Sequence, residues 1–283
     1  MQYVLQDFQW KFAQKCVIMK TTNKRKRGTT MKLGAQLFSI RTHLQNAEDL
    51  RKSFLKIKEI GYENVQLSGA AAMPAEIIRD ASEESGLPIV CTHVSFERLI
   101  HETDALIAEH KTFGCPVIGL GIMPKELRRT REGLESFLSQ LEEPVKRIRD
   151  AGLTFAYHNH AFELEPFTDG SEGIAYDMML ERLDWNFIMD TYWVEFAGKS
   201  AVEYIAKIGG ERLSNIHFKD LGTDEKRSIC PCGNGTLNFE EIFAACQRVG
   251  VKNVLVEQDN AVDSPDAFAD MATSFKHLRN IVH

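Results

Sequence analysis

The sequence of 283 residues lacks the features that mark membrane-spanning, disulfide-bonded or disordered proteins. It has no run of about 18 uncharged apolar residues, so we expect no transmembrane helix and no membrane partner. Cysteine is sparse, with six residues, no Cys-x-x-Cys pair, and a Cys-Pro-Cys at 230–232 whose spacing suits zinc poorly. Scattered cysteines in a chain of this length are typical of reduced thiols, so we expect a cytoplasmic protein.

Basic residues are fewer than acidic residues, and a cluster of them lies near the N-terminus. The chain has 34 basic and 40 acidic residues, which argues against nucleic acid as a partner. Residues 1–30 end in a polar basic stretch around Lys24–Arg27. A secretory signal would have its basic residues first, so this segment is not read as one. We expect residues 1–30 to be an N-terminal extension outside the fold and residues 31–283 to form the domain.

Short β-like runs alternate with helical patterns from Met31 onward. Alternation of this kind predicts parallel strands joined by right-handed crossovers. Eight units in about 250 residues is the count of a closed (β/α)8 barrel. An open doubly wound sheet usually has a Gly-rich loop after its first strand, but residues 39–46 contain no glycine. The sequence therefore predicts an α/β fold, a single-domain (β/α)8 TIM barrel. The β-like runs are 32–40, 64–69, 88–95, 116–122, 154–160, 186–193, 213–220 and 253–259, and the helical patterns are 47–60, 74–85, 97–112, 131–150, 172–183, 200–208, 239–249 and 265–281.

The predicted strands separate apolar from polar side chains, because successive side chains point to opposite faces. Apolar side chains can face the surrounding helices, and the polar set then points into the barrel. Active sites of such barrels lie at the C-terminal strand ends, and a buried polar cluster costs several kcal/mol unless its members pair or bind something. The polar faces of five strands place the following residues inside: Gln66 and Ser68, His93, His158 and His160, His217 and Lys219, and Glu257 and Asp259.

Metal ligands are available from four consecutive predicted strands. The fifth offers His158, His160 or Glu163, and the next three offer one side chain each. Adjacent strands lie about 4.8 Å apart, so their ends can converge on one ion. Carboxylate oxygens with imidazole suit Mn²⁺, Mg²⁺, Co²⁺ or Zn²⁺. The later candidates are Asp190, His217 and Glu257.

Six segments together resemble the xylose isomerase-like TIM-barrel superfamily, in the branch of sugar phosphate isomerases/epimerases. The segments are GAQLFSIR (34–41), YHNHAFELE (157–165), MDTYWVEFAG (189–198), HFKD (217–220), GNGTLNF (233–239) and VEQD (256–259). The resemblance implies one divalent metal ion, with Mn²⁺ expected first, bound by a carboxylate from strand five, an Asp from six, a His from seven and a Glu from eight. Asp190, His217 and Glu257 match directly.

The first ligand does not match, because this chain has His158-Asn159-His160 where relatives have a Glu. The favoured assignment makes Glu163 the metal ligand and leaves His158 and His160 for proton transfer or substrate binding. The other assignment makes one histidine the ligand and Glu163 a substrate contact.

The resemblance implies a metal-dependent isomerase or epimerase that abstracts a proton from a keto sugar and forms an enediolate. Glu257 is then both ligand and base, with His158 or His160 as the catalytic partner. Lys219 would steady developing negative charge. His93, Gln36 and Trp193 are the further substrate-binding candidates, and Trp193 is equally expected as a core residue. The alternatives are a lyase or dehydratase acting on keto-sugars, keto-glycosides or inosose-like cyclitols, and a non-catalytic sugar-binding protein. A small-molecule sugar is the expected partner, and a homo-oligomer is left open.

Overall fold

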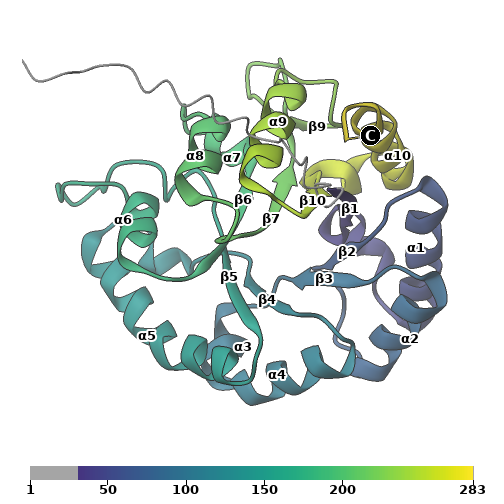
Figure 1. Ribbon diagram of the computed structural model, residues 1–283, viewed down its shortest axis with the longest axis horizontal. Helices are drawn as coiled ribbons and strands as arrows, with labels where there is room; N and C mark the ends of the chain where they lie inside the picture. Colours follow the sequence, from purple (N-terminus) through teal and green to yellow (C-terminus); the bar gives the residue numbers. More distant parts are fainter. Residues whose placement is uncertain (1–30, 283) are drawn as a thin grey trace, which may run out of the picture.

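The structure, a computed structural model, describes residues 31–282 and contains a barrel of eight parallel strands inside a ring of helices (Figure 1). The strands follow the order β3-β2-β1-β10-β7-β6-β5-β4. The two end strands meet through a parallel bridge between Val94 and Leu120, so the predicted single-domain (β/α)8 barrel is confirmed. The barrel strands are β1 Lys32–Gln36, β2 Val65–Leu67, β3 Ile89–Thr92, β4 Val117–Leu120, β5 Thr154–His158, β6 Asn186–Asp190, β7 Leu213–Phe218 and β10 Asn253–Val256.

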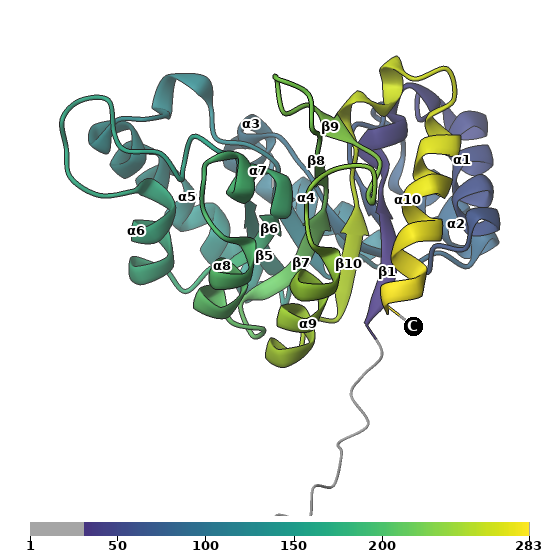
Figure 2. The same cartoon turned by 90° about the horizontal axis from the view of Figure 1, so that it is seen from above.

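Helices follow the strands and pack around the barrel (Figure 2). A short antiparallel hairpin of β8 Asp220–Leu221 and β9 Ile229–Cys230 follows β7, at the end of the barrel where the strands finish. The α-helices are α1 Ala47–Ile60, α2 Ala75–Ser85, α3 Phe96–His101, α4 Thr103–Thr112, α5 Arg131–Asp150, α6 Ala175–Arg182, α7 Thr191–Phe196, α8 Ala201–Ile208, α9 Phe239–Val249 and α10 Ala267–Val282, with 3-10 helices η1 Leu37–His43, η2 Lys125–Leu127 and η3 Asp259–Asp263.

Two predicted strands end earlier than the apolar runs suggested, because side chains cap helices directly after them. The Gln36 side chain accepts a hydrogen bond from Phe38 N, and η1 begins at Leu37. The Asp190 side chain accepts one from Trp193 N, and α7 begins at Thr191. The predicted helix over 97–112 is likewise two helices, α3 and α4, separated by Glu102. The caps at Gln36 and Asp190 thus end β1 and β6 and begin the next helix directly at the strand end.

The strand faces divide as predicted. Phe155 and Tyr157 of β5 are buried in the main core, which also contains buried residues of the surrounding helices, whereas Ala156 belongs to a separate apolar cluster. That second cluster consists of Cys91, Val117, Ala156 and Ile188. Since its members come from β3 to β6, the cluster occupies the lower part of this side of the barrel interior, below the polar side chains.

The predicted N-terminal extension, residues 1–30, lies outside the described residues, so the boundary at Met31 stays a prediction. Within residues 31–282, no helix is long and apolar enough to cross a membrane.

Candidate metal centre and active site

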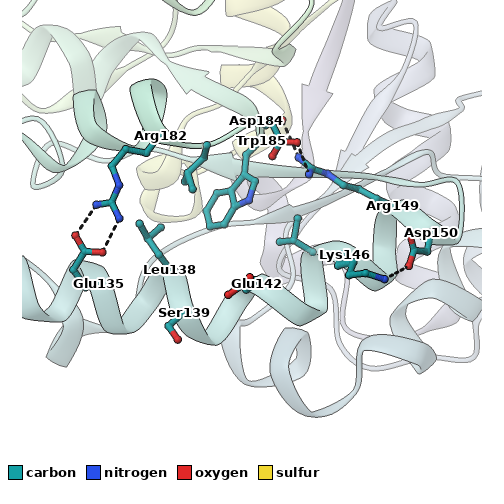
Figure 3. A pocket seen from close by; sticks show the side chains of 12 residues that line it. Glu135, Leu138, Ser139, Glu142, Lys146, Arg149, Asp150, Arg182, Asp184 and Trp185 are labelled. Carbon is teal, nitrogen blue, oxygen red and sulfur yellow. Dashed lines mark hydrogen bonds and ion pairs between the residues drawn. The ribbon is translucent and has the colours of Figure 1, made fainter.

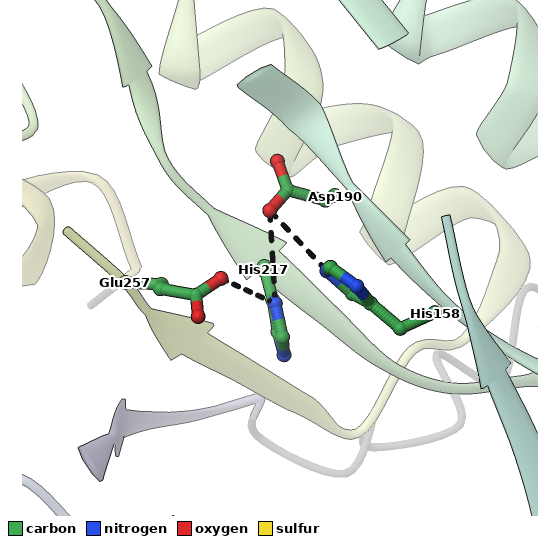
Figure 4. Close-up of side chains that lie close together, drawn as sticks. All are labelled: His158, Asp190, His217 and Glu257. Atoms are coloured by element: carbon green, nitrogen blue, oxygen red, sulfur yellow. Dashed lines mark hydrogen bonds and ion pairs between the residues drawn. The ribbon is translucent and has the colours of Figure 1, made fainter. Parts of the chain in front are cut away.

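Four buried side chains converge at the C-terminal ends of adjacent barrel strands (Figure 4). His158 ends β5, Asp190 ends β6, His217 lies in β7, and Glu257 directly follows β10. One potential ligand atom from each lies within 4.8 Å of all the others. The structure therefore brings together Asp190, His217 and Glu257, as the sequence predicted, and adds His158.

Backbone register explains the convergence. Asp190 pairs with His217 across β6 and β7, and His217 pairs with Leu255, two residues before Glu257. Nδ1 of His217 lies 2.8 Å from Oε2 of Glu257 and 3.8 Å from Oδ2 of Asp190. Nε2 of His158 lies 3.4 Å from the same Asp190 oxygen. All four side chains thus face one small volume.

Hydrogen bonds show which nitrogen of each imidazole faces the cluster. Nδ1 of His158 lies 3.0 Å from the Gly121 carbonyl oxygen, which can only accept, so Nδ1 donates to it and Nε2 is the nitrogen that faces the cluster. Nε2 of His217 lies 2.8 Å from Oε1 of Gln66, and Nδ1 of His217 faces Oε2 of Glu257. An imidazole that donates from one nitrogen and directs the other toward carboxylates is the usual form of a metal-bound histidine.

Lys219 adds a buried cation to the cluster. Its Nζ lies 3.1 Å from Glu257 Oε2, 3.3 Å from Asp190 Oδ2 and 2.9 Å from Asp259 Oδ2. When both imidazoles offer a lone pair to a cation, three carboxylates and one ammonium leave two negative charges. Buried charges need compensation, and a divalent cation supplies the two positive charges that balance them. The donors and the charge therefore both fit one divalent ion.

The charged partners control protonation in this cluster. Burial opposes ionisation of Asp190 and Glu257, but Lys219 and the neighbouring histidines outweigh burial and lower both pKa values. Burial lowers the pKa of His217, whereas the two carboxylates raise it to a net value of about 9. A cation that binds at Nδ1 of His217 near neutral pH must therefore displace a proton.

Glu163, the ligand favoured from the sequence, lies apart from the cluster. Its Oε1 accepts a hydrogen bond from Tyr157 OH at 2.5 Å and its Oε2 accepts one from His160 N at 2.8 Å. The chain turns after His158, and the carboxylate folds back toward Tyr157 on the helix-facing side of β5. Burial raises the pKa of Glu163 to about 7 against these hydrogen bonds. The structure thus brings His158, not Glu163, to the other three residues.

The other predicted catalytic and substrate-binding residues surround the cluster. The rings of His93 and His160 lie 4.8 Å and 4.9 Å from that of His158, and Trp193 lies 5.2 Å from His160. Nε2 of Gln36 lies 3.4 Å from Nδ1 of His93. Burial lowers the pKa values of His93 and His160, so both are neutral. Among these surrounding residues, three ring nitrogens have no hydrogen-bond partner within residues 31–282: His93 Nε2, His160 Nδ1 and Trp193 Nε1.

A cavity of about 310 Å³ adjoins the cluster, and its lining includes His158, His160, Lys219 and Glu257. Polar groups that converge on a cavity are typical of a substrate site. A larger hollow of about 560 Å³ lies on the outer surface beside α5 (Figure 3). Most of its charged side chains pair with one another, so we assign the active site to the smaller cavity. The pairs are Glu135–Arg182, Arg149–Asp184 and Lys146–Asp150.

Two site residues were not singled out from the sequence. Gln66 contacts His217 and Asp259 contacts Lys219. The alternation of side chains along β2 and after β10 already placed both on the inward face, which was the available signal. Their partners could not be named, because they lie on other strands of the barrel.

A family model described as xylose isomerase-like TIM barrel matches residues 54–281. Among similar solved structures, a sugar phosphate isomerase/epimerase from Parabacteroides distasonis is 24% identical, with 88% of this chain and 98% of that chain covered at a TM-score of 0.73. A D-allulose 3-epimerase from Methylomonas sp. is 13% identical, with 89% and 98% covered at a TM-score of 0.67. The probable 3-DHS dehydratase AsbF from Bacillus anthracis is 14% identical, with 88% and 99% covered at a TM-score of 0.67. No curated protein matches the sequence.

Proposed function

The chain belongs to the xylose isomerase-like TIM barrel family, and from that premise we propose that it isomerises or epimerises a keto sugar at one divalent metal ion. The observation that carries the proposal is the convergence of His158, Asp190, His217 and Glu257 beside a cavity large enough for a small molecule. The metal-ligand assignment in this proposal replaces Glu163 with His158. Mn²⁺ is the expected ion, and Mg²⁺, Co²⁺ and Zn²⁺ suit the same donors.

The bound ion would act as a Lewis acid toward the carbonyl and the adjacent hydroxyl oxygen of the sugar. Glu257 is the base in the proposal, because its lowered pKa keeps the carboxylate ionised. It takes the proton from the carbon next to the carbonyl and leaves an enediolate. Lys219, with Nζ 3.1 Å from that carboxylate, balances the negative charge that develops on a substrate oxygen.

His160 relays the proton from Glu257 back to the substrate in this proposal, since His158 is used as a ligand. The His160 ring is neutral, lines the cavity and has an unpartnered Nδ1. The unpartnered nitrogens of His93 and Trp193 bind sugar hydroxyls, and Gln36 orients the His93 ring. Return of the proton to the neighbouring carbon gives isomerisation, and return to the opposite face gives epimerisation.

Elimination is the second candidate. His93 and His160 are two neutral histidines beside the cluster in addition to the two proposed ligands, and either can relay the proton taken by Glu257 to a leaving group. A lyase or dehydratase acting on a keto-sugar, a keto-glycoside or an inosose-like cyclitol would use the same base and the same ion.

Incubation of the Mn²⁺-loaded protein with a keto-sugar panel in D₂O, followed by NMR, tests the proposal. We expect a new sugar with deuterium at the carbon beside the carbonyl, and no reaction after EDTA treatment. An unsaturated product or a released aglycone would select elimination. Binding of the sugars without exchange or product would contradict an enzymatic role and favour a non-catalytic sugar-binding protein.

A further inference from the structure

Gln66 is a buried amide in the barrel interior, and only one of its two side-chain polar atoms has a hydrogen-bond partner among the described residues. It lies in β2, three strands from β7 in the sheet order, and its side chain reaches His217 of β7. The residue has no exposed surface. Its Oε1 lies 2.8 Å from Nε2 of His217, whereas its Nε2 has no hydrogen-bond partner among residues 31–282. Half of the amide is thus buried without compensation, which costs about 1–3 kcal/mol.

We propose that Gln66 is a positioning residue that holds His217 in the tautomer whose Nδ1 faces the metal centre. An amide oxygen can only accept, so Nε2 of His217 must donate to it. Once a cation has displaced the proton from Nδ1, the remaining ring proton is on the nitrogen remote from Asp190 and Glu257, and Nδ1 offers its lone pair to the cation. The inference rests on the proposed metal centre, since the lone pair needs a cation to bind.

The opposite arrangement shows what Gln66 prevents. An amide turned by half a rotation would donate to Nε2 of His217 and move the ring proton to Nδ1. That proton would point toward Glu257, 2.8 Å away, and would occupy the direction in which the cation must approach. Loss of the acceptor removes the bias between the two tautomers. Outer hydrogen-bond partners of this kind typically change metal affinity by about 10- to 100-fold.

Three variants isolate this role. Gln66→Met keeps the length of the side chain and removes the acceptor. Gln66→Glu keeps an acceptor at the same place and removes the donor. Asn215→Leu is the matched control, because Asn215 is a buried amide on the same face of β7 as His217 whose side-chain atoms have no hydrogen-bond partner among the described residues.

The experiment measures the Zn²⁺ dissociation constant of the full chain by competition with a chelator, together with the Tm of the metal-free protein. Gln66→Met should weaken Zn²⁺ binding by about 10- to 100-fold without lowering the Tm. Gln66→Glu should bind at least as tightly as the wild type, and Asn215→Leu should bind like it. A purely structural role would instead lower the Tm of Gln66→Met.

Nitrogen-15 NMR of the Zn²⁺-loaded protein reads the tautomer directly. The wild type and Gln66→Glu should show a slowly exchanging Nε2 proton on His217, and Gln66→Met should lose that slow exchange. Wild-type affinity in Gln66→Met would overturn the role of Gln66 and leave the metal centre intact. Equal losses in Gln66→Glu or Asn215→Leu would also overturn it. Failure of the wild type to bind Zn²⁺ would remove both proposals.

Discussion

The barrel interior has two layers that differ in chemistry although they belong to the same strand faces. Ala156 and Ile188 lie in the lower layer, which is apolar from β3 to β6, and two residues further along the same strands His158 and Asp190 lie in the upper, polar layer. Side-chain alternation decides that all four point inward. The position along the strand decides whether an inward side chain is apolar or polar, because the lower layer is closed by packing and the upper layer adjoins the cavity.

The lower layer also supports the electrostatics of the upper one. Apolar side chains beneath the cluster keep water away from its lower side, so charges there interact more strongly than at the surface. Lys219 and the two carboxylates Asp190 and Glu257 then depend on one another and, in the proposed function, on a cation. Substitutions in the two layers should therefore separate stability from metal-dependent activity.

The largest effect is expected for Glu257→Gln in the upper layer. The variant loses both a proposed metal ligand and the proposed base, and a base alone contributes about 10²- to 10⁴-fold. Turnover of the keto sugar identified by NMR should fall by at least that factor, while the circular dichroism spectrum stays unchanged. Glu142→Gln, at the exposed outer hollow, is the matched control. Unchanged turnover in Glu257→Gln would refute the proposed site.

Ile188→Ala in the lower layer should reverse that pattern. The missing side-chain atoms leave a cavity, which lowers the free energy of unfolding by about 2–5 kcal/mol. Urea denaturation measures this loss, and a Zn²⁺ titration should show an affinity close to that of the wild type. Asp190→Asn, two residues away, should lose Zn²⁺ binding with a much smaller loss of stability. If Ile188→Ala and Asp190→Asn lose Zn²⁺ affinity and free energy of unfolding to the same extent, the proposed difference between the layers is wrong.

Glu163 allows a smaller test, because it is buried outside both layers. Its pKa is raised from 4.5 to about 7, so its stabilising contribution is present below pH 4.5 and is lost as the pH rises through about 7. Relative to Glu163→Gln, the free energy of unfolding of the wild type should fall by roughly 3 kcal/mol between these pH values. Urea denaturation at several pH values measures the difference. Parallel profiles would show that Glu163 ionises normally.

The fold and three of the four converging residues could be predicted, because they depend on local patterns. Periodicity identifies eight units, and alternation places Asp190, His217 and Glu257 at neighbouring strand ends. The fourth converging residue, His158, was only the second choice from the sequence, because residue type favoured Glu163. The carboxylate of Glu163 is the better match to the superfamily, but a turn after His158 directs it to Tyr157 OH. Such a turn depends on contacts that the sequence pattern does not contain.

The strand ends and the role of Gln66 were missed for a related reason. Gln36 and Asp190 end their strands by capping the next helix. This local signal was missed because apolar residues continue beyond both caps. Gln66 acts through His217, a contact between residues 151 positions apart. Alternation places both side chains inside the barrel, but only the closed sheet shows which of them meet.

Anomalous diffraction from a crystal grown with Mn²⁺ tests the central claim most directly. We predict one Mn²⁺ bound by Nε2 of His158, Nδ1 of His217 and carboxylate oxygens of Asp190 and Glu257, with bonds of about 2.0–2.3 Å. A manganese peak at Glu163, or four side chains that separate around no peak, would contradict it.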